Sequence, residues 1–316
     1  MSILSKFLLL FILNISSFSA TFDQAAEAYL EKDFKKAFKL FEELASTGNV
    51  NAQYNLAMFY YKGTGVEQNK IFAFIWFDTA SKNGHKLAQN RLGYMYEKGE
   101  VKGTKSELAA VKEFLKSAIQ NYDMAQLNLA MKYNSNIKEE SLERARFWYE
   151  KAAANGNTAA MNNLANMYYA AQTVKRDYKK AFELYFKAAK RGDVVAQFNI
   201  SMMYYGGEYV KQSDDDALYW LTKSASNGSA IAQVRLGTFY REGYTLVNQD
   251  YNKALHWYYK AANQNWAEGQ YYIGYCYFYG FAVKADNKKA AYWMHKAKVN
   301  GYSHATTFML RNKLYY

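Results

Sequence analysis

The sequence predicts an all-α protein, a right-handed α-solenoid superhelix of about eight antiparallel helix pairs closed by a C-terminal capping helix. Three observations predict this fold. They are an internal period of 35 to 37 residues, a capping side chain at one fixed place in the period, and a glycine or asparagine at another. Proline is absent from the 316 residues, so these small and capping residues must set the helix boundaries.

The first helix of each unit is defined by a recurring small residue, here called the anchor. Side chains four and eight residues after the anchor are mostly Leu or Ile and then Tyr, and small residues stand five after it. These offsets share one helical face, which predicts an amphipathic helix that lets a second helix come close. The anchors are Ala52, Ala88, Ala125, Ala160, Ala196, Ala232, Gly269 and Ala305.

The second helix of each unit carries its own alanine, followed three residues later by tryptophan in five of the eight units. We expect this ring to be buried against the first helix. The alanines are Ala37, Ala73, Ala110, Ala145, Ala181, Ala217, Ala254 and Ala290, and the tryptophans are Trp76, Trp148, Trp220, Trp257 and Trp293.

Helix ends follow from local chemistry. Four residues before each of these alanines stands a side chain that can cap a helix N-terminus: Asp33, Asn69, Ser106, Ser141, Asp177, Ser213, Asp250 and Asp286. Each second helix is followed by a residue that tolerates the left-handed conformation of a helix C-cap: Gly48, Gly84, Asn121, Gly156, Gly192, Gly228, Asn265 and Gly301.

These boundaries predict the division of the chain. A signal peptide occupies residues 1–20, an N-terminal helix pair 22–48, and a C-terminal capping helix 302–316. Seven repeats lie between them, at 49–84, 85–121, 122–156, 157–192, 193–228, 229–265 and 266–301.

The first 20 residues contain Lys6, an apolar run over 7–13 and a small-residue stretch. The run is much shorter than the roughly 20 residues of a membrane span, so it predicts a cleaved secretory signal, with no stable membrane insertion after cleavage. The alternative is an uncleaved N-terminal anchor. Export predicts a bacterial periplasmic or secreted protein. Two glycosylation sequons, at 199–201 and 227–229, keep a eukaryotic secretory lumen open.

The formal net charge is +12, which suits an anionic partner such as an acidic glycan, or reflects a lysine-rich composition. The lysines are spread over all repeats, which disfavours nucleic acid. Cys276 is the only cysteine, which excludes an internal disulfide and a Cys-based zinc site. Its aromatic neighbours in the sequence predict a buried thiol.

No pattern predicts catalysis, a cofactor or a metal. The four histidines lack metal-ligand spacing, and glycine loops such as residues 62–66 lack the ending of a phosphate-binding loop. We therefore predict a protein that is not an enzyme.

Binding is expected on the face of the first helices opposite the anchors, at offsets 2, 3, 6, 9 and 10. Amides there could bind a peptide backbone and aromatic rings its side chains. Alternatively, the asparagines could bond the neighbouring repeat and the tyrosines pack between helices. The candidate ligand-binding residues are Asn55, Arg91, Asn128, Asn163, Asn199, Arg235, Arg241, Tyr54, Tyr94, Phe198 and Tyr271.

The strings AQYNLAMFYYKGTGV (52–66) and AQVRLGTFYREGYTLV (232–247), with a capped second helix and a glycine joint, resemble the Sel1-like repeat family, a relative of the tetratricopeptide repeats. The resemblance covers nearly all of the mature chain. It implies that the candidate face lines a concave groove. In the related repeats, an asparagine matching Asn55, Asn128, Asn163 and Asn199 often contacts peptide backbone.

The resemblance also implies a function, an exported non-enzymatic adaptor that binds a protein or peptide in this groove. The alternative is an envelope or polysaccharide-binding protein. A more remote one is a hydrolase of the cysteine-rich branch linked to β-lactam binding, whose paired cysteines are missing here. Repeats beginning at Ala125 and Ala160 lose their loop glycines, which predicts altered turns at 133–137 and 168–174.

Overall fold

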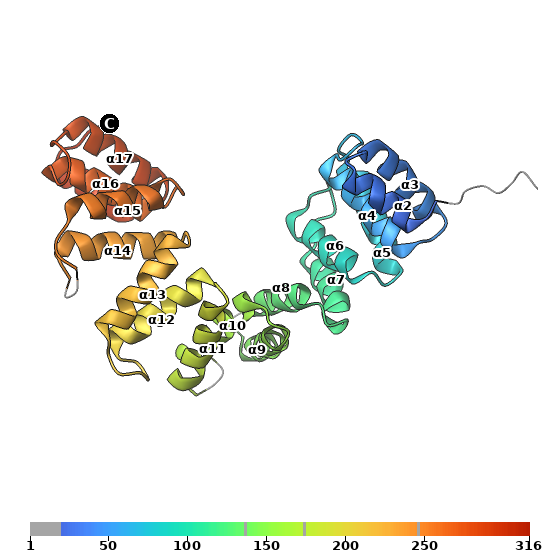
Figure 1. Cartoon of the computed structure of the whole chain (residues 1–316), viewed down its shortest axis with the longest axis horizontal. Coiled ribbons are helices and arrows are strands. Elements are labelled where there is room, and N and C mark those ends of the chain that lie inside the picture. The colour runs from blue at the N-terminus through green and yellow to red at the C-terminus, as the bar shows by residue number, and fades with distance from the viewer. Residues whose placement is uncertain (1–19, 136–137, 173–174, 245–246) are drawn as a thin grey trace, which may run out of the picture. The chain divides into compact units, whose positions relative to one another are not determined.

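The protein is described by a computed structural model that covers residues 20–316 apart from 136–137, 173–174 and 245–246. Residues 1–19 of the predicted signal peptide lie outside the described residues. The described part forms 17 α-helices and no strand, so the predicted all-α solenoid of helical hairpins is confirmed (Figure 1). The chain divides into two compact units, unit 1 (Met1–Asn155) and unit 2 (Gly156–Tyr316).

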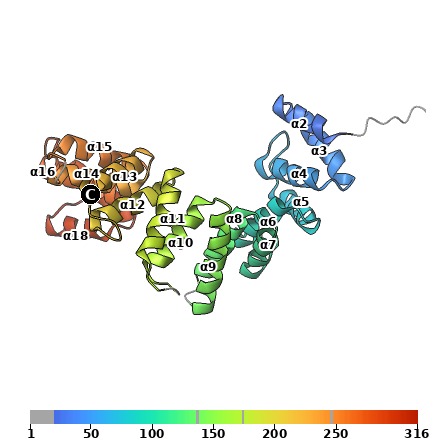
Figure 2. The ribbon, with the colours of Figure 1, turned by 60° about the horizontal axis from the view of Figure 1, so that its bottom comes forward.

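Each unit is a stack in which every helix packs on the next one along the chain (Figures 1 and 2). Unit 1 contains α2 (Phe22–Leu30), α3 (Phe34–Ser46), α4 (Val50–Lys62), α5 (Lys70–Lys82), α6 (Lys86–Lys98), α7 (Glu107–Ile119), α8 (Asp123–Asn134) and α9 (Glu139–Ala154). Unit 2 contains α10 (Thr158–Tyr169), α11 (Tyr178–Lys190), α12 (Val194–Gly206), α13 (Asp214–Ser226), α14 (Ala230–Glu242), α15 (Tyr251–Ala262), α16 (Ala267–Tyr279), α17 (Asn287–Val299) and α18 (Ser303–Arg311).

The small residues of the first helices permit close helix packing, as predicted. A Cβ added at Gly93 would lie 2.6 Å from the ring of Phe114, and one at Gly237 would lie 2.6 Å from the ring of Tyr258. The anchors are completely buried. The two helices of each pair therefore contact each other through small side chains, and aromatic rings pack beside this contact.

Of the five tryptophans that were predicted to be buried, Trp220 is buried, whereas Trp76, Trp148, Trp257 and Trp293 are only half-buried. The side chain that fills the space within each pair stands one position later: Phe41, Phe77, Phe114, Tyr149, Tyr185, Leu221, Tyr258 and Met294. Tryptophans instead pack between successive second helices, as in the edge-to-face pairs Phe186–Trp220 and Tyr259–Trp293. At 100° per residue, the later position points more directly at the first helix.

Seven of the eight predicted N-caps accept a backbone hydrogen bond, and Ser141 is the exception. Helix α9 begins at Glu139, so Ser141 lies inside its first turn, and the predicted cap there is wrong. Glu139 and Glu140 favour this earlier start because acidic side chains stabilise the positive end of the helix dipole. All eight predicted joint residues adopt positive φ, between 59° and 100°.

The two predicted altered turns are confirmed in their described parts. Five first helices end at a left-handed glycine: Gly63, Gly99, Gly207, Gly243 and Gly280. Helices α8 and α10 end at right-handed Ser135 and Ala170 instead. Ala171, which occupies the position of those glycines, has a φ of 60°.

A buried glutamine after the anchor forms a hydrogen-bonded series that we call the glutamine ladder. In five repeats its amide Nε2 donates to a carbonyl of the preceding second helix: Gln53 to Ala45, Gln89 to Ser81, Gln126 to Ala118, Gln197 to Ala189 and Gln233 to Ala225. In six repeats its Oε1 accepts from the joint of the same repeat: from Asn83, Gln120, Asn155, Asn227, Gln264 and Asn300. Met161 replaces the glutamine once, and there Arg191 donates to the carbonyl of Gly156 at 3.0 Å.

Cys276 is completely buried in a cluster with Tyr258 and Ile273, as predicted. Burial raises the pKa of its thiol from 9.0 to about 12. The thiol is therefore protonated and shielded at neutral pH.

Candidate binding site

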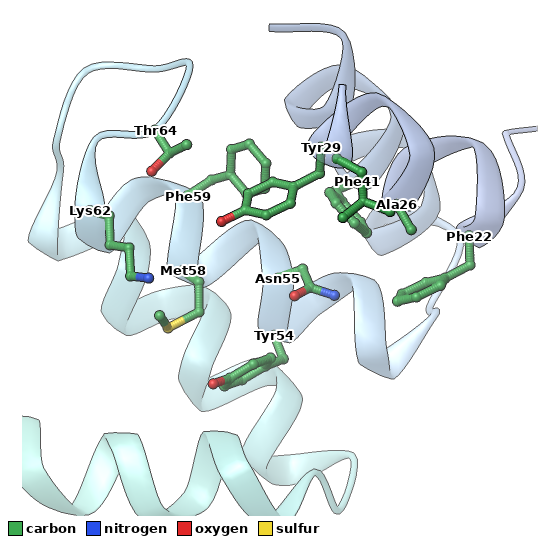
Figure 3. A pocket seen from close by; sticks show the side chains of 11 residues that line it. Phe22, Ala26, Tyr29, Phe41, Tyr54, Asn55, Met58, Phe59, Lys62 and Thr64 are labelled. Carbon is green, nitrogen blue, oxygen red and sulfur yellow. The ribbon is translucent and has the colours of Figure 1, made fainter. Parts of the chain in front are cut away.

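A cavity of about 380 Å³ lies between the first three described helices of unit 1 (Figure 3). We call it the α2–α4 pocket. Helix α2 contributes Phe22, Ala26, Tyr29 and Leu30, α3 contributes Phe41, α4 contributes Tyr54, Asn55, Met58, Phe59 and Lys62, and Thr64 follows α4. Most of these side chains are apolar, and none of them is acidic.

Local chemistry sets where α2 begins and where α4 ends. Thr21 and Gln24 form a reciprocal capping box, which starts α2 at Phe22. Gly63 stops α4 in the left-handed conformation, with a φ of 72°, immediately after Lys62. The two helix ends therefore place Phe22 and Lys62 at the edges of the pocket.

Aromatic rings form a packed wall in the pocket. Phe41 lies edge-on to Phe22, with ring centroids 5.5 Å apart, and Phe59 lies 5.6 Å from Phe41 and 5.8 Å from Tyr29. Such pairs hold each other's orientation in addition to burying area. Tyr54 is fixed from outside, because its ring stacks on His85 at 4.6 Å. Burial raises the pKa of Tyr54, an effect that nearby Arg91 partly opposes.

The side chains of Asn55 and Lys62 have no hydrogen-bond or ion-pair partner among the described residues. Asn55 is half-buried, and Figure 3 shows its amide directed into the cavity. Lys62 is exposed at one end and pairs with no described carboxylate. The pocket can therefore hold a large apolar group, an amide of a peptide backbone and, at Lys62, a negative charge.

The other candidates of unit 1 are used within the protein. The guanidinium of Arg91 lies 5.0 Å from the ring of Tyr61. Tyr94 donates to Asn128 at 2.8 Å, and Asn128 donates to Asn90 at 2.8 Å. For Asn128 the structure thus shows the bond to a neighbouring repeat that the sequence left open as the alternative to peptide binding.

Unit 2 contains the remaining candidates, which do not share one cavity. Asn199 donates to Asn162 at 2.9 Å, again between repeats. Arg241 lies over the rings of Tyr272 and Tyr275, at 4.8 and 5.6 Å, and contacts the carboxylate of Glu242.

Four further candidates of unit 2 differ in exposure. Phe198 packs on the core around Leu236, and Tyr271 lies 5.1 Å from Tyr302. Asn163 is half-buried and Arg235 is exposed, and neither has a hydrogen-bond partner among the described residues.

The sequence predicted Tyr54 and Asn55 as binding residues but not the rest of the pocket. Phe22, Tyr29 and Phe41 belong to the N-terminal helix pair, which the repeat pattern presents only as packing material. The signal in the sequence was the presence of five aromatic residues over 22–41.

The described residues contain neither a metal-ligand cluster nor a membrane-spanning helix. No group of three or more His, Cys, Asp and Glu side chains is placed to hold a metal ion. No helix in these parts of the chain combines the length and the apolar composition that crossing a membrane requires.

The repeats match a known family model. The Sel1 repeat model matches residues 25–49, 50–85, 86–122, 123–157, 158–193, 194–229, 230–266 and 267–301. The chain belongs to the Sel1 repeat family. The first match, at residues 25–49, falls on the N-terminal helix pair. The family model therefore counts eight Sel1 repeats, whereas the sequence pattern predicted an N-terminal helix pair followed by seven repeats. Sel1 repeats form a scaffold that commonly mediates protein interactions and is typically not catalytic.

Two solved Sel1 structures are similar over most of this chain. One is c5321, a protective antigen of uropathogenic Escherichia coli strains, with 31% identity and a TM-score of 0.68 over 88% of this chain and 60% of c5321. The other is a Sel1 repeat protein from Oxalobacter formigenes, with 28% identity and a TM-score of 0.71 over 91% of this chain and 86% of that one.

A curated relative matches a shorter stretch. The chitin synthase regulator SKT5 of Saccharomyces cerevisiae is 37% identical over 67 residues, which is 21% of this chain and 10% of SKT5. The chain thus spans a small part of SKT5 and less than two thirds of c5321.

Proposed function

We propose that this Sel1 repeat protein is an exported, non-enzymatic adaptor that binds a protein partner by holding a peptide segment in the α2–α4 pocket. The observation that carries the proposal is the pocket itself, an apolar cavity with the unpartnered amide of Asn55 inside it. The N-terminal sequence pattern supports export. The absence of acidic, histidine and cysteine side chains from the lining supports binding without catalysis.

The chemistry of the lining defines the peptide. A large aromatic or aliphatic side chain would fill the space between Tyr29, Met58 and Phe59, because desolvated apolar anchors contribute most of the energy in such contacts. The amide of Asn55 can both donate to and accept from the peptide backbone. Lys62 favours an acidic residue close to the anchor, because the rim contains no competing carboxylate.

Selection from a displayed peptide library on the full chain tests this proposal. We expect enrichment of peptides that combine one large apolar residue with a nearby acidic one. Asn55→Ala should weaken the selected peptides by roughly tenfold through loss of a buried hydrogen bond. Met58→Glu should abolish binding, because it places a carboxylate in the apolar cavity.

A matched control is available in the same unit. Met131 occupies the position of Met58 two repeats later and is 52% exposed. Met131→Glu should leave both peptide affinity and thermal stability unchanged. If Met58→Glu and Met131→Glu bind the selected peptides equally well, the pocket is not the binding site.

A further inference from the structure

Unit 2 carries a row of lysines, each placed over an aromatic ring on the second helix of a repeat. The ammonium of Lys190 lies 4.3 Å from the ring centroid of Phe186, that of Lys223 lies 5.1 Å from Trp220, that of Lys260 lies 4.6 Å from Trp257, and that of Lys296 lies 5.2 Å from Trp293. We call these four residues the lysine row. Cation–π contact restricts each ammonium to a fixed place on its helix.

The rings under the row show that its helices are neighbours. Phe186 of α11 lies 5.9 Å from Trp220 of α13, and Tyr259 of α15 lies 5.8 Å from Trp293 of α17. Trp257 of α15 packs on the core cluster that contains Leu221 of α13. Packed helices lie about 8–10 Å apart, so the helices that carry the row follow one another at about this spacing.

An exposed ring accompanies three of these lysines. Tyr219, His256 and Tyr292 immediately precede the tryptophans and stand nearly perpendicular to them, at 80°, 76° and 81°. Tyr219 is 57% exposed and Tyr292 is 42% exposed. A hollow of about 580 Å³ along α13 is lined by Tyr219, Thr222 and Lys223, with Asp215 also contributing. Each of these repeats thus presents a flat ring beside a cation.

Charge is segregated in the same way. The row lies on residues 184–190, 217–226, 254–262 and 290–299, which contain six lysines and no acidic residue, while Glu183 and Asp214–Asp216 lie at the earlier turns of α11 and α13. Unit 2 has 20 Lys and Arg against 11 Asp and Glu, whereas unit 1 has 20 against 17. Lys223, Lys260 and Lys296 stand at one repeat position, whereas Lys190 stands three residues later in its helix. In unit 1 that position holds Glu43, Thr79, Lys116 in an ion pair with Glu113, and Lys151, which lies 5.6 Å from the ring of Phe147.

We propose that this face of unit 2 binds an acidic polysaccharide, a linear polymer of sugar rings that bear carboxylates. The exposed rings would stack on the apolar faces of successive sugars, and the row would pair with their carboxylates. This partner is favoured over an anionic bilayer because three successive repeats each offer one exposed planar ring beside one cation. Several weak contacts in line add up through multivalency.

Binding of the full chain to polygalacturonate, with neutral dextran as the comparison, tests the proposal. We expect retention on polygalacturonate that weakens as salt rises, and none on dextran. Lys223→Gln, Lys260→Gln and Lys296→Gln together should lower affinity by about tenfold or more, while glutamine preserves helix propensity. The control removes the same charge from exposed lysines of unit 1, by Lys35→Gln, Lys39→Gln and Lys112→Gln.

A second variant separates stacking from charge. Tyr219→Ser with Tyr292→Ser should lower affinity severalfold at every salt concentration, whereas the lysine variant should also flatten the salt dependence. Equal losses in the row and control variants would show ion exchange and overturn the proposal. Retention on anionic phospholipid vesicles but not on polygalacturonate would also overturn it. Neither result bears on the α2–α4 pocket, which lies in unit 1.

Discussion

Both units are built from the same kind of repeat, but in one repeat of unit 2 the helices are linked by different hydrogen bonds. In unit 1, Gln53, Gln89 and Gln126 each pair with the amide of their joint. The first repeat of unit 2 has Met161 in place of the glutamine. Arg191 at the joint of this repeat donates instead to the backbone carbonyl of Gly156. The difference teaches that where the ladder amide is absent the joint side chain bonds elsewhere, because a buried amide without a partner costs more than an apolar side chain.

The largest difference between the units is expected at alkaline pH. Unit 2 contains Tyr169, Cys276 and Tyr302, whose pKa values are raised to about 12, in each case mainly by burial. Burial raises the pKa values of Tyr185 and Tyr258 as well. In the unfolded chain these groups lose protons near their ordinary values of 9.0 and 10.0. Folding stability is therefore lost as pH rises through that range towards 12.

We expect unit 2 to unfold at a lower pH than unit 1. Methyl NMR of the buried methionines would measure this, with Met95 reporting on unit 1 and Met203 and Met294 on unit 2. Tyr258→Phe removes one of the perturbed groups and should raise the pH at which unit 2 unfolds. Loss of the Met95 signal first would contradict the comparison.

The next largest effect concerns the glutamine ladder. Gln126 is 2% exposed and bonds to Ala118, Asn121 and Asn155. Gln126→Ala should lower the free energy of unfolding by about 2 kcal/mol, because it removes the hydrogen bonds that this buried amide makes to Ala118, Asn121 and Asn155. Urea denaturation measures the change.

Replacing Met161 and Arg191 of unit 2 by the residues found in unit 1 tests the same difference between the units. Met161→Gln alone should destabilise by about 1–2 kcal/mol, since its amide would meet the side chain of Arg191 rather than asparagine. Adding Arg191→Asn should recover about 1 kcal/mol in a double-mutant cycle. Additive effects of the two changes would show that the ladder positions are independent of each other.

The smallest effect is expected at the turns. Ala171 pays a steric cost for its φ of 60°, whereas Gly207 has a φ of 68° at the same place in the next repeat. Ala171→Gly should therefore stabilise by about 1 kcal/mol, and Gly207→Ala should destabilise by a similar amount. Thermal unfolding of the two variants measures both, and the same sign for both would contradict this reading.

Sequence reasoning worked where the cause of a structure is local. The left-handed joints, seven N-caps and the buried anchors all follow from residues within one or two turns of each other. It failed at Ser141, because Glu139 and Glu140 favour an earlier start of helix α9. It also failed at Trp148, because the next residue, Tyr149, points more directly into the core.

The pocket could be predicted only in part, because it depends on how three helices converge. Tyr54 and Asn55 were predicted from the face they occupy on α4. Tyr29 and Phe41 come from helices whose relative placement no spacing in the sequence specifies. The glutamine ladder shows the same limit, since Gln126 and Asn155 are 29 residues apart and meet only after folding.

The burial of Cys276 makes the native chain suitable for site-directed labelling. Its protonated thiol should react slowly with maleimides, so a cysteine introduced at an exposed position would be modified selectively without removal of the native one. One such label in each unit would permit energy-transfer or spin-label measurements of the distance between units 1 and 2, with and without a bound partner.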